Sequence, residues 1–177
     1  MTIYERIIRR ALFKLDPEKA HVLAITVLKA NLVPPAKITN EDVLSTEIWG
    51  QKIKNPIGLA AGFDKNAAAI GNLSKLGFGF IEVGTVTPQP QVGNPRPRMF
   101  RLEEDDAIIN RLGFNSEGLE VFRNRLQSRK KKGLETVVGA NIGMNRDTSD
   151  EASDFVKGVR SVSEFADYIV VNISSPN

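Results

Sequence analysis

The sequence contains no cysteine, and this absence excludes several kinds of chemistry at once. Disulfide bonds, thiolate zinc sites, iron–sulfur clusters and a cysteine nucleophile all require thiol side chains. The absence is compatible with a reducing compartment, where disulfides do not form. His21 is the only histidine and no Asp/Glu cluster offers metal ligands, so we expect no metal site. Neutral polar and basic side chains remain as the candidates for chemistry.

Long apolar runs are also missing, because none reaches the roughly 18–20 residues that a membrane-spanning helix needs. The N-terminus has no small-residue cleavage site after an apolar core, so we expect no signal peptide. Basic residues crowd the segment 123–132, but no aromatic residues alternate with them. We therefore predict no nucleic-acid partner and interpret the segment as the solvated, cationic end of a helix.

Residues 1–35 differ from the rest of the chain. Apolar residues fall at helical spacing between Ile3 and Leu15, with basic residues between them. Asp16 and Pro17 then read as the N-cap and first residue of a second, more apolar helix, closed by Pro34 and Pro35. From the pattern alone, this hairpin either lies in a membrane interface or packs on the main domain, and neither alternative is favoured.

Residues 36–177 alternate between short apolar strands and helices, after a linker that leads into a hairpin at 46–54. A second hairpin is predicted at 98–109, inside a Pro- and Gly-rich excursion spanning 88–110. The predicted strands are 57–61, 78–86, 136–142 and 168–173, and the predicted helices are 66–76, 117–129 and 149–160, the last with Ser149 as N-cap. This alternation predicts an α/β fold with a parallel sheet covered by helices.

Two architectures compete: an open doubly wound sheet, and a (β/α)₈ TIM barrel of which the chain holds the first four β/α units. No Gly-x-Gly-x-x-Gly motif follows the first strand, so a dinucleotide site is not supported. Polar residues follow every predicted strand, as barrel loops require. We therefore predict half of a barrel at 36–177, with the two-helix extension at 1–35.

Asparagine recurs at the ends of these strands. Asn110 and Asn115 close the excursion, Asn141 and Asn145 follow the third strand, and Asn172 and Asn177 follow the fourth. A single asparagine is more often a turn or cap residue. Neutral amides both donate and accept hydrogen bonds, however, so together they match the alternating edges of a flavin or a pyrimidine.

At these residues the chain resembles the quinone-dependent, membrane-associated class (class 2) of dihydroorotate dehydrogenases. The resemblance covers essentially the whole chain, including the two-helix extension. Six segments carry it in order: Gly58-Leu-Ala-Ala-Gly-Phe-Asp-Lys65, Gly84-Thr-Val-Thr-Pro-Gln-Pro90, Gly93-Asn-Pro-Arg-Pro-Arg98, Asn110-Arg-Leu-Gly-Phe-Asn115, Asn141-Ile-Gly143 and Asn172-Ile-Ser-Ser-Pro-Asn177.

The resemblance implies an FMN-containing barrel that oxidises dihydroorotate to orotate in pyrimidine synthesis. It implies that electrons pass to a quinone, either ubiquinone or menaquinone. Residues 1–35 would contact the membrane surface and form the quinone entrance. The full-length protein would be a peripheral monomer on the cytoplasmic face of the inner membrane.

The resemblance also implies roles for particular residues. The FMN contacts would be Ala61, Gly62, Phe63, Asp64, Lys65, Thr85, Asn141 and Asn172. The substrate contacts would be Lys65, Asn110, Arg111, Leu112, Gly113, Phe114, Asn172 and Asn177. Ser175 would be the catalytic base. Serine needs a dry site and a proton outlet for this role, because its free pKa is unfavourable. The cytosolic class uses cysteine there, so the lack of cysteine fits the quinone class.

The family continues for roughly as many residues again, consistent with a barrel of about 250 residues plus the extension. We therefore expect the isolated chain to bind FMN poorly and to show no turnover. Two alternatives remain. The chain is then either a non-catalytic, membrane-surface-binding half-barrel, or part of a related FMN barrel that acts on another pyrimidine. The hairpin and the Asn172–Asn177 segment argue against the last alternative.

Overall fold

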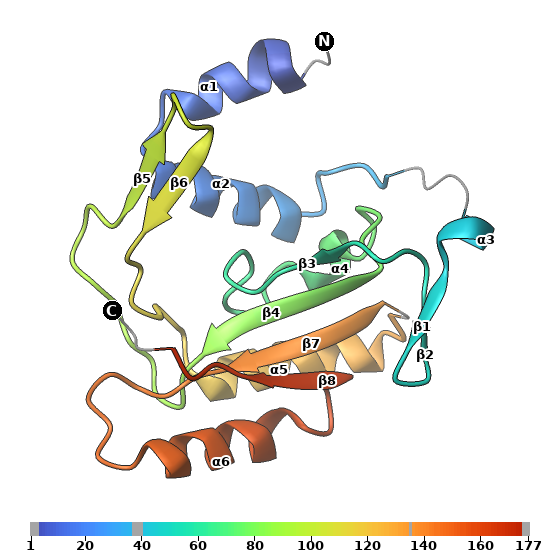
Figure 1. Cartoon of the computed structure of the whole chain (residues 1–177), viewed down its shortest axis with the longest axis vertical. Coiled ribbons are helices and arrows are strands. Elements are labelled where there is room, and N and C mark those ends of the chain that lie inside the picture. Colours follow the sequence, from blue (N-terminus) through green and yellow to red (C-terminus); the bar gives the residue numbers. More distant parts are fainter. Residues whose placement is uncertain (1–3, 37–40, 135, 175–177) are drawn as a thin grey trace.

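The computed structural model describes residues 4–36, 41–134 and 136–174. Its centre is a parallel sheet of β3 (Gly58–Leu59), β4 (Phe80–Val86), β7 (Val137–Ile142) and β8 (Tyr168–Val171), paired in this order. Helices α5 (Leu119–Lys131) and α6 (Glu151–Val162) lie on the same side of the sheet (Figure 1). Strand order thus follows chain order without reversal, which is the arrangement of successive β/α-barrel units.

The hydrophobic core lies between the sheet and these helices. Alternate residues of β4 and β7 point toward the helices, and their branched side chains are almost fully buried. On the helix side, Phe122 and Leu126 of α5 and Val162 of α6 meet them. The opposite face carries Phe80 and Glu82 of β4, both only partly buried, and this face corresponds to the interior of a barrel.

The segment after β3 differs from its prediction. A helix was expected at 66–76, but α4 spans only Ile70–Leu73. The buried Asp64 carboxylate accepts hydrogen bonds from the backbone N–H groups of Ala68 and Ala69, at 2.8 and 2.7 Å. Ala67, immediately before these two residues, has a positive φ of 57°, which a right-handed α-helix does not accommodate. A loop organised around the Asp64 carboxylate therefore replaces the first turns of the expected helix.

Other boundaries were predicted more closely. Strand β3 is shorter than the expected 57–61, and α6 takes Asp150 as its N-cap in place of Ser149, since the Asp150 carboxylate accepts from the N–H of Ser153 at 2.9 Å. Both hairpins are confirmed, as β1 (Thr46–Ile48) with β2 (Gln51–Ile53) and β5 (Met99–Leu102) with β6 (Ala107–Asn110). Helix α3 (Glu41–Leu44) was not predicted.

The N-terminal extension contains a π-helical turn (Tyr4–Ile8), α1 (Arg9–Phe13) and α2 (Pro17–Lys29). The predicted cap is confirmed: Asp16 accepts a hydrogen bond from the N–H of Lys19 at 3.0 Å, and Pro17 is the first helical residue. The hairpin of β5 and β6 lies beside both helices (Figure 1). The extension thus packs against the excursion between β4 and α5.

The basic segment at the end of α5 is not wholly a solvated helix end, as had been expected. Arg129 is buried, at 7% exposure, and forms an ion pair with Asp167 at 2.7 Å. The same guanidinium donates to the carbonyl oxygens of Thr136 and Phe165. It therefore ties α5 to the entry points of β7 and β8, and only its neighbours contribute surface charge.

Candidate functional site

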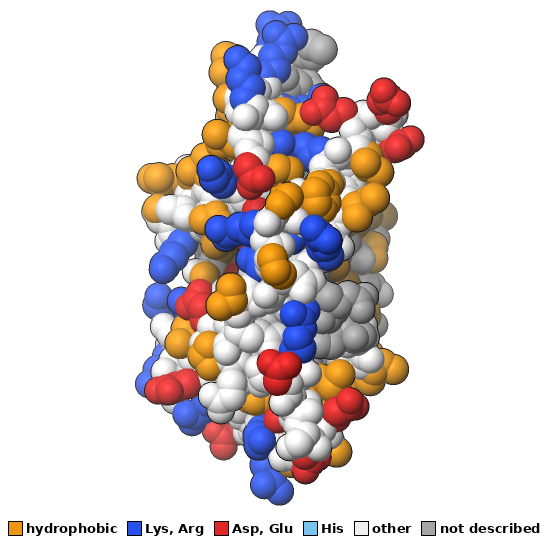
Figure 2. Space-filling view, turned by 90° about the vertical axis from the view of Figure 1, so that its left-hand side faces the viewer, with side chains coloured by type: hydrophobic (Ala, Val, Ile, Leu, Met, Phe, Trp, Pro, Cys, Tyr) orange, Lys and Arg blue, Asp and Glu red, His pale blue; other side chains and the backbone are white. Residues whose placement is uncertain are grey.

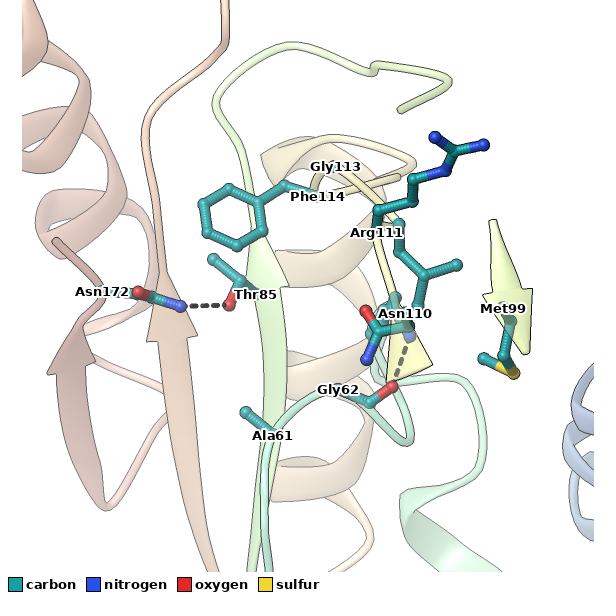
Figure 3. A pocket seen from close by; sticks show the side chains of 11 residues that line it. Ala61, Gly62, Thr85, Met99, Asn110, Arg111, Gly113, Phe114 and Asn172 are labelled. Atoms are coloured by element: carbon teal, nitrogen blue, oxygen red, sulfur yellow. Dashed lines mark hydrogen bonds between the residues drawn. The ribbon is translucent and has the colours of Figure 1, made fainter. Parts of the chain in front are cut away.

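The main pocket, about 430 Å³ in volume, opens at the carboxyl ends of the strands. The loop after β3, the ends of β4 and β8, and the last residues of the excursion contribute its walls. Its lining residues are Ala61, Gly62, Lys65, Thr85, Met99, Asn110, Arg111, Leu112, Gly113, Phe114 and Asn172. Thr85 and Asn172 face Asn110 and Arg111 across it (Figure 3). All of these except Met99 were named from the sequence, although they come from separate segments.

Lys65 supplies the cation of the pocket. Its Nζ donates a hydrogen bond to the carbonyl oxygen of Gly62, which holds the side chain against the loop. Burial lowers the pKa of Lys65 below its usual value, while the carboxylates of Glu18 and Asp64 partly oppose this effect. The ammonium group is thus partly desolvated, so its charge acts strongly on any anionic group that forms nearby.

Gly62 leaves open space above the floor of the pocket. Its φ of +98° favours glycine, and a Cβ atom added there would meet no protein atom within 4 Å. A flat ring can therefore approach the backbone at this point. Asp64 does not line this pocket, because its side chain is committed to the loop that it caps.

The 110–114 wall is held in place by two residues of the excursion. Asn94 donates from its backbone N–H to the carbonyl of Leu112 at 3.0 Å and from its side chain to the carbonyl of Arg111 at 2.7 Å. The Gln91 side chain donates to the carbonyls of Gly113 and Phe114, at 3.2 and 3.1 Å. Sequence reasoning assigned neither residue a role, because their partners are backbone groups that no motif displays.

A chain of side-chain hydrogen bonds runs from the pocket into the interior face of the sheet. Asn172 Nδ2 donates to Thr85 Oγ1 at 3.0 Å (Figure 3), and Thr85 Oγ1 donates to Asn141 Oδ1 at 2.5 Å. Asn141 Nδ2 in turn donates to Glu82 Oε1 at 2.7 Å. Asn141 therefore lies behind the pocket wall, and Glu82 was missed by the sequence analysis altogether.

Thr85 reaches this chain because β4 changes register. Gly84 pairs with Asn141 and Val86 pairs with Ile142, which leaves Thr85 as an extra residue in the strand. In a regular strand Thr85 would point toward the helices, since side chains alternate. The bulge turns its hydroxyl to the interior face instead.

A second pocket, also about 430 Å³, lies between the N-terminal helices and the hairpin of β5 and β6. Phe63 lines this pocket and not the first, and its ring meets that of His21 edge to face at 5.3 Å. Burial lowers the pKa of His21, so the neutral imidazole is favoured there. The other lining residues are mainly apolar or basic: Arg9, Leu12, Phe13, Pro17, Ala20, Met99, Arg101, Leu102, Glu103, Asp106, Ala107 and Ile108.

Glu18 of α2 anchors the extension to the excursion. Its carboxylate is 8% exposed and accepts from Arg98 Nη2 at 2.6 Å and from Arg96 Nε and Nη2 at 3.0 Å each. Hydrogen bonds from Arg98 lower the pKa of Glu18 to about 2. Arg98 also donates to the carbonyls of Val92 and Asn94, at 2.6 and 2.9 Å. The anchor thus connects α2 to the segment that shapes the main pocket.

Two predicted site residues, Ser175 and Asn177, lie outside the described residues. The structure reaches Ser174, whose backbone N–H donates to Asn172 Oδ1 at 3.0 Å. This short-range bond makes an Asx turn, which bends the chain immediately after β8.

Sequential parallel strands, helices on one side and a polar pocket at the strands' carboxyl ends define part of a TIM-type β/α barrel. Residues 43–177 match the dihydroorotate dehydrogenase family. The chain therefore belongs to that family.

Relatives and solved structures agree with this assignment. The dihydroorotate dehydrogenase (quinone) of Bartonella tribocorum is 55% identical over 177 residues, which is 100% of this chain and 48% of the relative. The mitochondrial dihydroorotate dehydrogenase (quinone) of Mus musculus is 52% identical over 92% of this chain and 42% of its own length. The chain thus spans less than half the length of these relatives.

A crystal structure of DHODH from Eimeria tenella in complex with ferulenol superposes with a TM-score of 0.87, at 46% identity, over 94% of this chain and 47% of the other. The ligand-free structure from the same organism gives a TM-score of 0.85, at 50% identity.

Proposed function

We propose that this chain forms the N-terminal half of a barrel that oxidises dihydroorotate to orotate and delivers the electrons to a quinone, in pyrimidine biosynthesis. The observation that carries the proposal is the convergence of Lys65, Thr85, Asn172 and the 110–114 wall on one pocket. The family assignment supports it, and the names of the relatives give both the substrate and the quinone acceptor. The same names argue against a barrel for another pyrimidine.

The residues of the pocket fit an FMN ring. The open space above Gly62 accommodates a planar group, and the amide and hydroxyl groups of Thr85 and Asn172 suit its polar edge. Ala61 and Lys65 complete this side, with Asn141 behind Thr85. Phe63 and Asp64 would not contact the ring directly. Phe63 would separate the main pocket from the second pocket, and Asp64 would hold the loop after β3 in place. Bound FMN would supply the hydride acceptor for the reaction.

The opposite wall, formed by Asn110, Arg111, Leu112, Gly113 and Phe114, would hold dihydroorotate together with Lys65, Asn172 and Asn177. Lys65 would stabilise the negative charge that develops on the substrate as its C5 proton leaves. Ser175 would accept that proton.

The second pocket would receive the quinone. Phe63 stands between the two pockets, since it lines the second and directly follows Gly62 of the first. The neutral His21 and the apolar side chains that make up most of the lining suit the apolar ring of a quinone. Met99 lines both pockets, so the proposed flavin and quinone sites are neighbours.

The extension would reach this quinone by resting on a membrane surface, which we place at the cytoplasmic face of the inner membrane for a monomeric full-length protein. Ile7, Val22, Leu23 and Leu32 are exposed by 44–71%. Figure 2 shows blue and orange side chains together at the upper end, where α1 lies in Figure 1. Mixed basic and apolar side chains suit an interface. No helix among residues 4–36, 41–134 and 136–174 is long and apolar enough to cross a membrane.

The test uses the complete protein that the gene encodes, purified in detergent. We expect flavin absorbance in the purified protein and orotate formation from dihydroorotate that depends on added quinone. If the protein carries flavin but reduces NAD⁺ or fumarate in place of quinone, the proposal that quinone is the electron acceptor is wrong. A protein without flavin or orotate formation would overturn the whole assignment.

A further inference from the structure

Glu82 ends the hydrogen-bond chain behind the main pocket, and the proposed reaction gives it no role. It lies on the interior face of β4, paired with Gly139 and two positions before the pair of Gly84 and Asn141. One carboxylate oxygen accepts from Asn141, and the other accepts from the hydroxyl of Tyr168 at 3.4 Å. Because this carboxylate ends a series of neutral hydrogen-bonding groups, it constrains how the groups next to it are oriented.

The direction of the chain follows from what each group can donate. An ionised carboxylate only accepts, so Asn141 must turn its NH₂ group to Glu82 and its oxygen to Thr85. Thr85 has one hydroxyl proton, which goes to that oxygen, and it therefore accepts from the NH₂ group of Asn172. Glu82 thus determines the orientation of the Asn141 amide and the Thr85 hydroxyl, and the backbone N–H of Ser174 holds the Asn172 amide from the other end.

This direction decides what the pocket offers to a ligand. The oxygen of Asn141 already accepts from Thr85, and the oxygen of Asn172 already accepts from the N–H of Ser174 at 3.0 Å. Asn172, which lines the pocket, keeps a second N–H hydrogen, because its NH₂ group has two. With Lys65 nearby, this side of the pocket is rich in donors, which favours a ring that gains electron density.

We propose that Glu82 is a positioning residue that orients Asn141 and Thr85, and so keeps Asn172, which lines the pocket, as an N–H donor toward the bound flavin. The inference rests on the proposed function, and Glu82 itself acts only through its neighbours. A glutamine at position 82 both donates and accepts. It would let the Asn141 amide turn over, and the Thr85 hydroxyl would then donate toward Asn172 and weaken the donation from the Asn172 amide that Glu82 maintains.

The experiment is a double-mutant cycle in the complete protein, with Glu82→Gln, Thr85→Val and the two combined. Flavin affinity is measured by fluorescence titration of the apoprotein, and the flavin reduction potential by spectroelectrochemistry. We expect E82Q to weaken FMN binding about tenfold, which corresponds to one charge-assisted hydrogen bond. We also expect a more negative potential, because fewer donors face the reduced ring.

Valine at position 85 interrupts the chain between Asn141 and Asn172. Adding E82Q to T85V should therefore weaken binding no further than T85V alone. Fully additive losses, or an E82Q protein with wild-type affinity and potential, would overturn the inference. A purely structural role for Glu82 would lower the melting temperature without moving the potential, and that result would overturn it too.

Tyr168→Phe is the matched control, because it removes a hydrogen bond to the other carboxylate oxygen and leaves Asn141 untouched. We expect its flavin affinity and potential to equal those of the wild type. If E82Q does not retain the wild-type circular dichroism spectrum, Glu82→Asp serves in the same cycle, since its shorter side chain withdraws from Asn141. A wild-type protein that binds no FMN would refute the proposed function itself, which separates that failure from a failure at Glu82.

Discussion

At the scale of single residues, the pocket combines one partly desolvated cation with neutral groups whose orientation is fixed by their neighbours. Lys65 is held by a backbone carbonyl, and Thr85 and Asn172 are held by one another. None of these groups has to reorganise when charge develops on a bound ring. Preorganisation of this kind is the main source of electrostatic catalysis.

Replacing Lys65 by Met should lower kcat for dihydroorotate oxidation by about 10²–10³-fold, the usual loss when one charge-stabilising group is removed from an active site. The reason is that the substrate loses the cation that offsets its developing negative charge. Steady-state kinetics of the complete protein would check this. Lys52→Met on the exposed strand β2 is the control and should leave kcat unchanged. Equal activity of the two variants would contradict the role of Lys65.

Replacing Ser175 by Ala should lower turnover by about 10²–10⁴-fold, as expected for the loss of a general base. Flavin content should not change, because the proposed FMN contacts lie elsewhere. The measurements are orotate formation and the flavin-to-protein absorbance ratio. Near-normal turnover would remove Ser175 from the mechanism, and loss of FMN would assign it to cofactor binding instead.

At the scale of secondary-structure elements, the anchor between α2 and the excursion is the most consequential contact. Glu18 and Arg98 are both buried, and removal of one partner leaves the other charge without compensation. The same arginine holds the loop that carries Asn94, which in turn supports the 110–114 wall. The extension and the main pocket therefore share one set of contacts.

Glu18→Ala should reduce the free energy of unfolding by about 3 kcal/mol at pH 7, since a buried arginine loses its counter-ion. Urea titration followed by circular dichroism would measure this. The matched control is Glu47→Ala, on the exposed strand β1, with an expected change within about 0.5 kcal/mol. Similar effects of the two variants would contradict the anchor.

The same contact predicts a dependence on pH. The pKa of Glu18 is lowered from 4.5 to about 2, so its stabilisation is complete above pH 4.5 and is lost as the pH falls from there toward 2. Wild-type stability should therefore drop more steeply over this interval than that of Glu18→Gln, in urea titrations at several pH values. Parallel curves would show that Glu18 does not titrate with folding.

Exposed apolar residues on α2 give a prediction for membrane binding. Changing Val22 and Leu23 to Ser should lower partitioning onto anionic liposomes about tenfold, because less apolar area enters the interface. Co-sedimentation would measure this partitioning. Changing Val156 and Val159 of α6 to Ser is the control, since these residues are similarly exposed on another element. Equal loss in both double variants would argue against a membrane-facing extension.

At the scale of the whole molecule, the four-stranded sheet is part of a barrel. Strand β8 pairs only with β7 among the described residues, and Tyr168 and Val170 of its interior face stay partly exposed. Residues 1–177 alone should therefore bind FMN at least tenfold more weakly than the complete protein, because fewer contacts hold the ring. Fluorescence titration of both proteins tests this. Equal affinity would show that the half-barrel is a sufficient flavin site.

Many of the secondary-structure elements were predicted correctly from local sequence patterns. Alternating apolar strands and helices indicated the parallel sheet, Asp16 and Pro17 marked the start of α2, and two hairpins followed from their turn residues. Asparagines were singled out because they stand at strand ends, where a parallel sheet brings them to one edge, and the family resemblance assigned the other residues of the main pocket except Met99. Such features depend on short-range periodicity and on chain direction, which sequence displays.

Only the tertiary structure decided the rest, because the responsible contacts join residues far apart in the chain. Asp64 turned an expected helix into a loop, and the bulge at Thr85 sent its hydroxyl to the interior face. The sequence analysis singled out neither Glu18 nor Glu82, and only the fold places Arg98 beside the first and Asn141 beside the second. Burial and hydrogen-bond direction are properties of the folded neighbourhood, and residue type alone does not encode them.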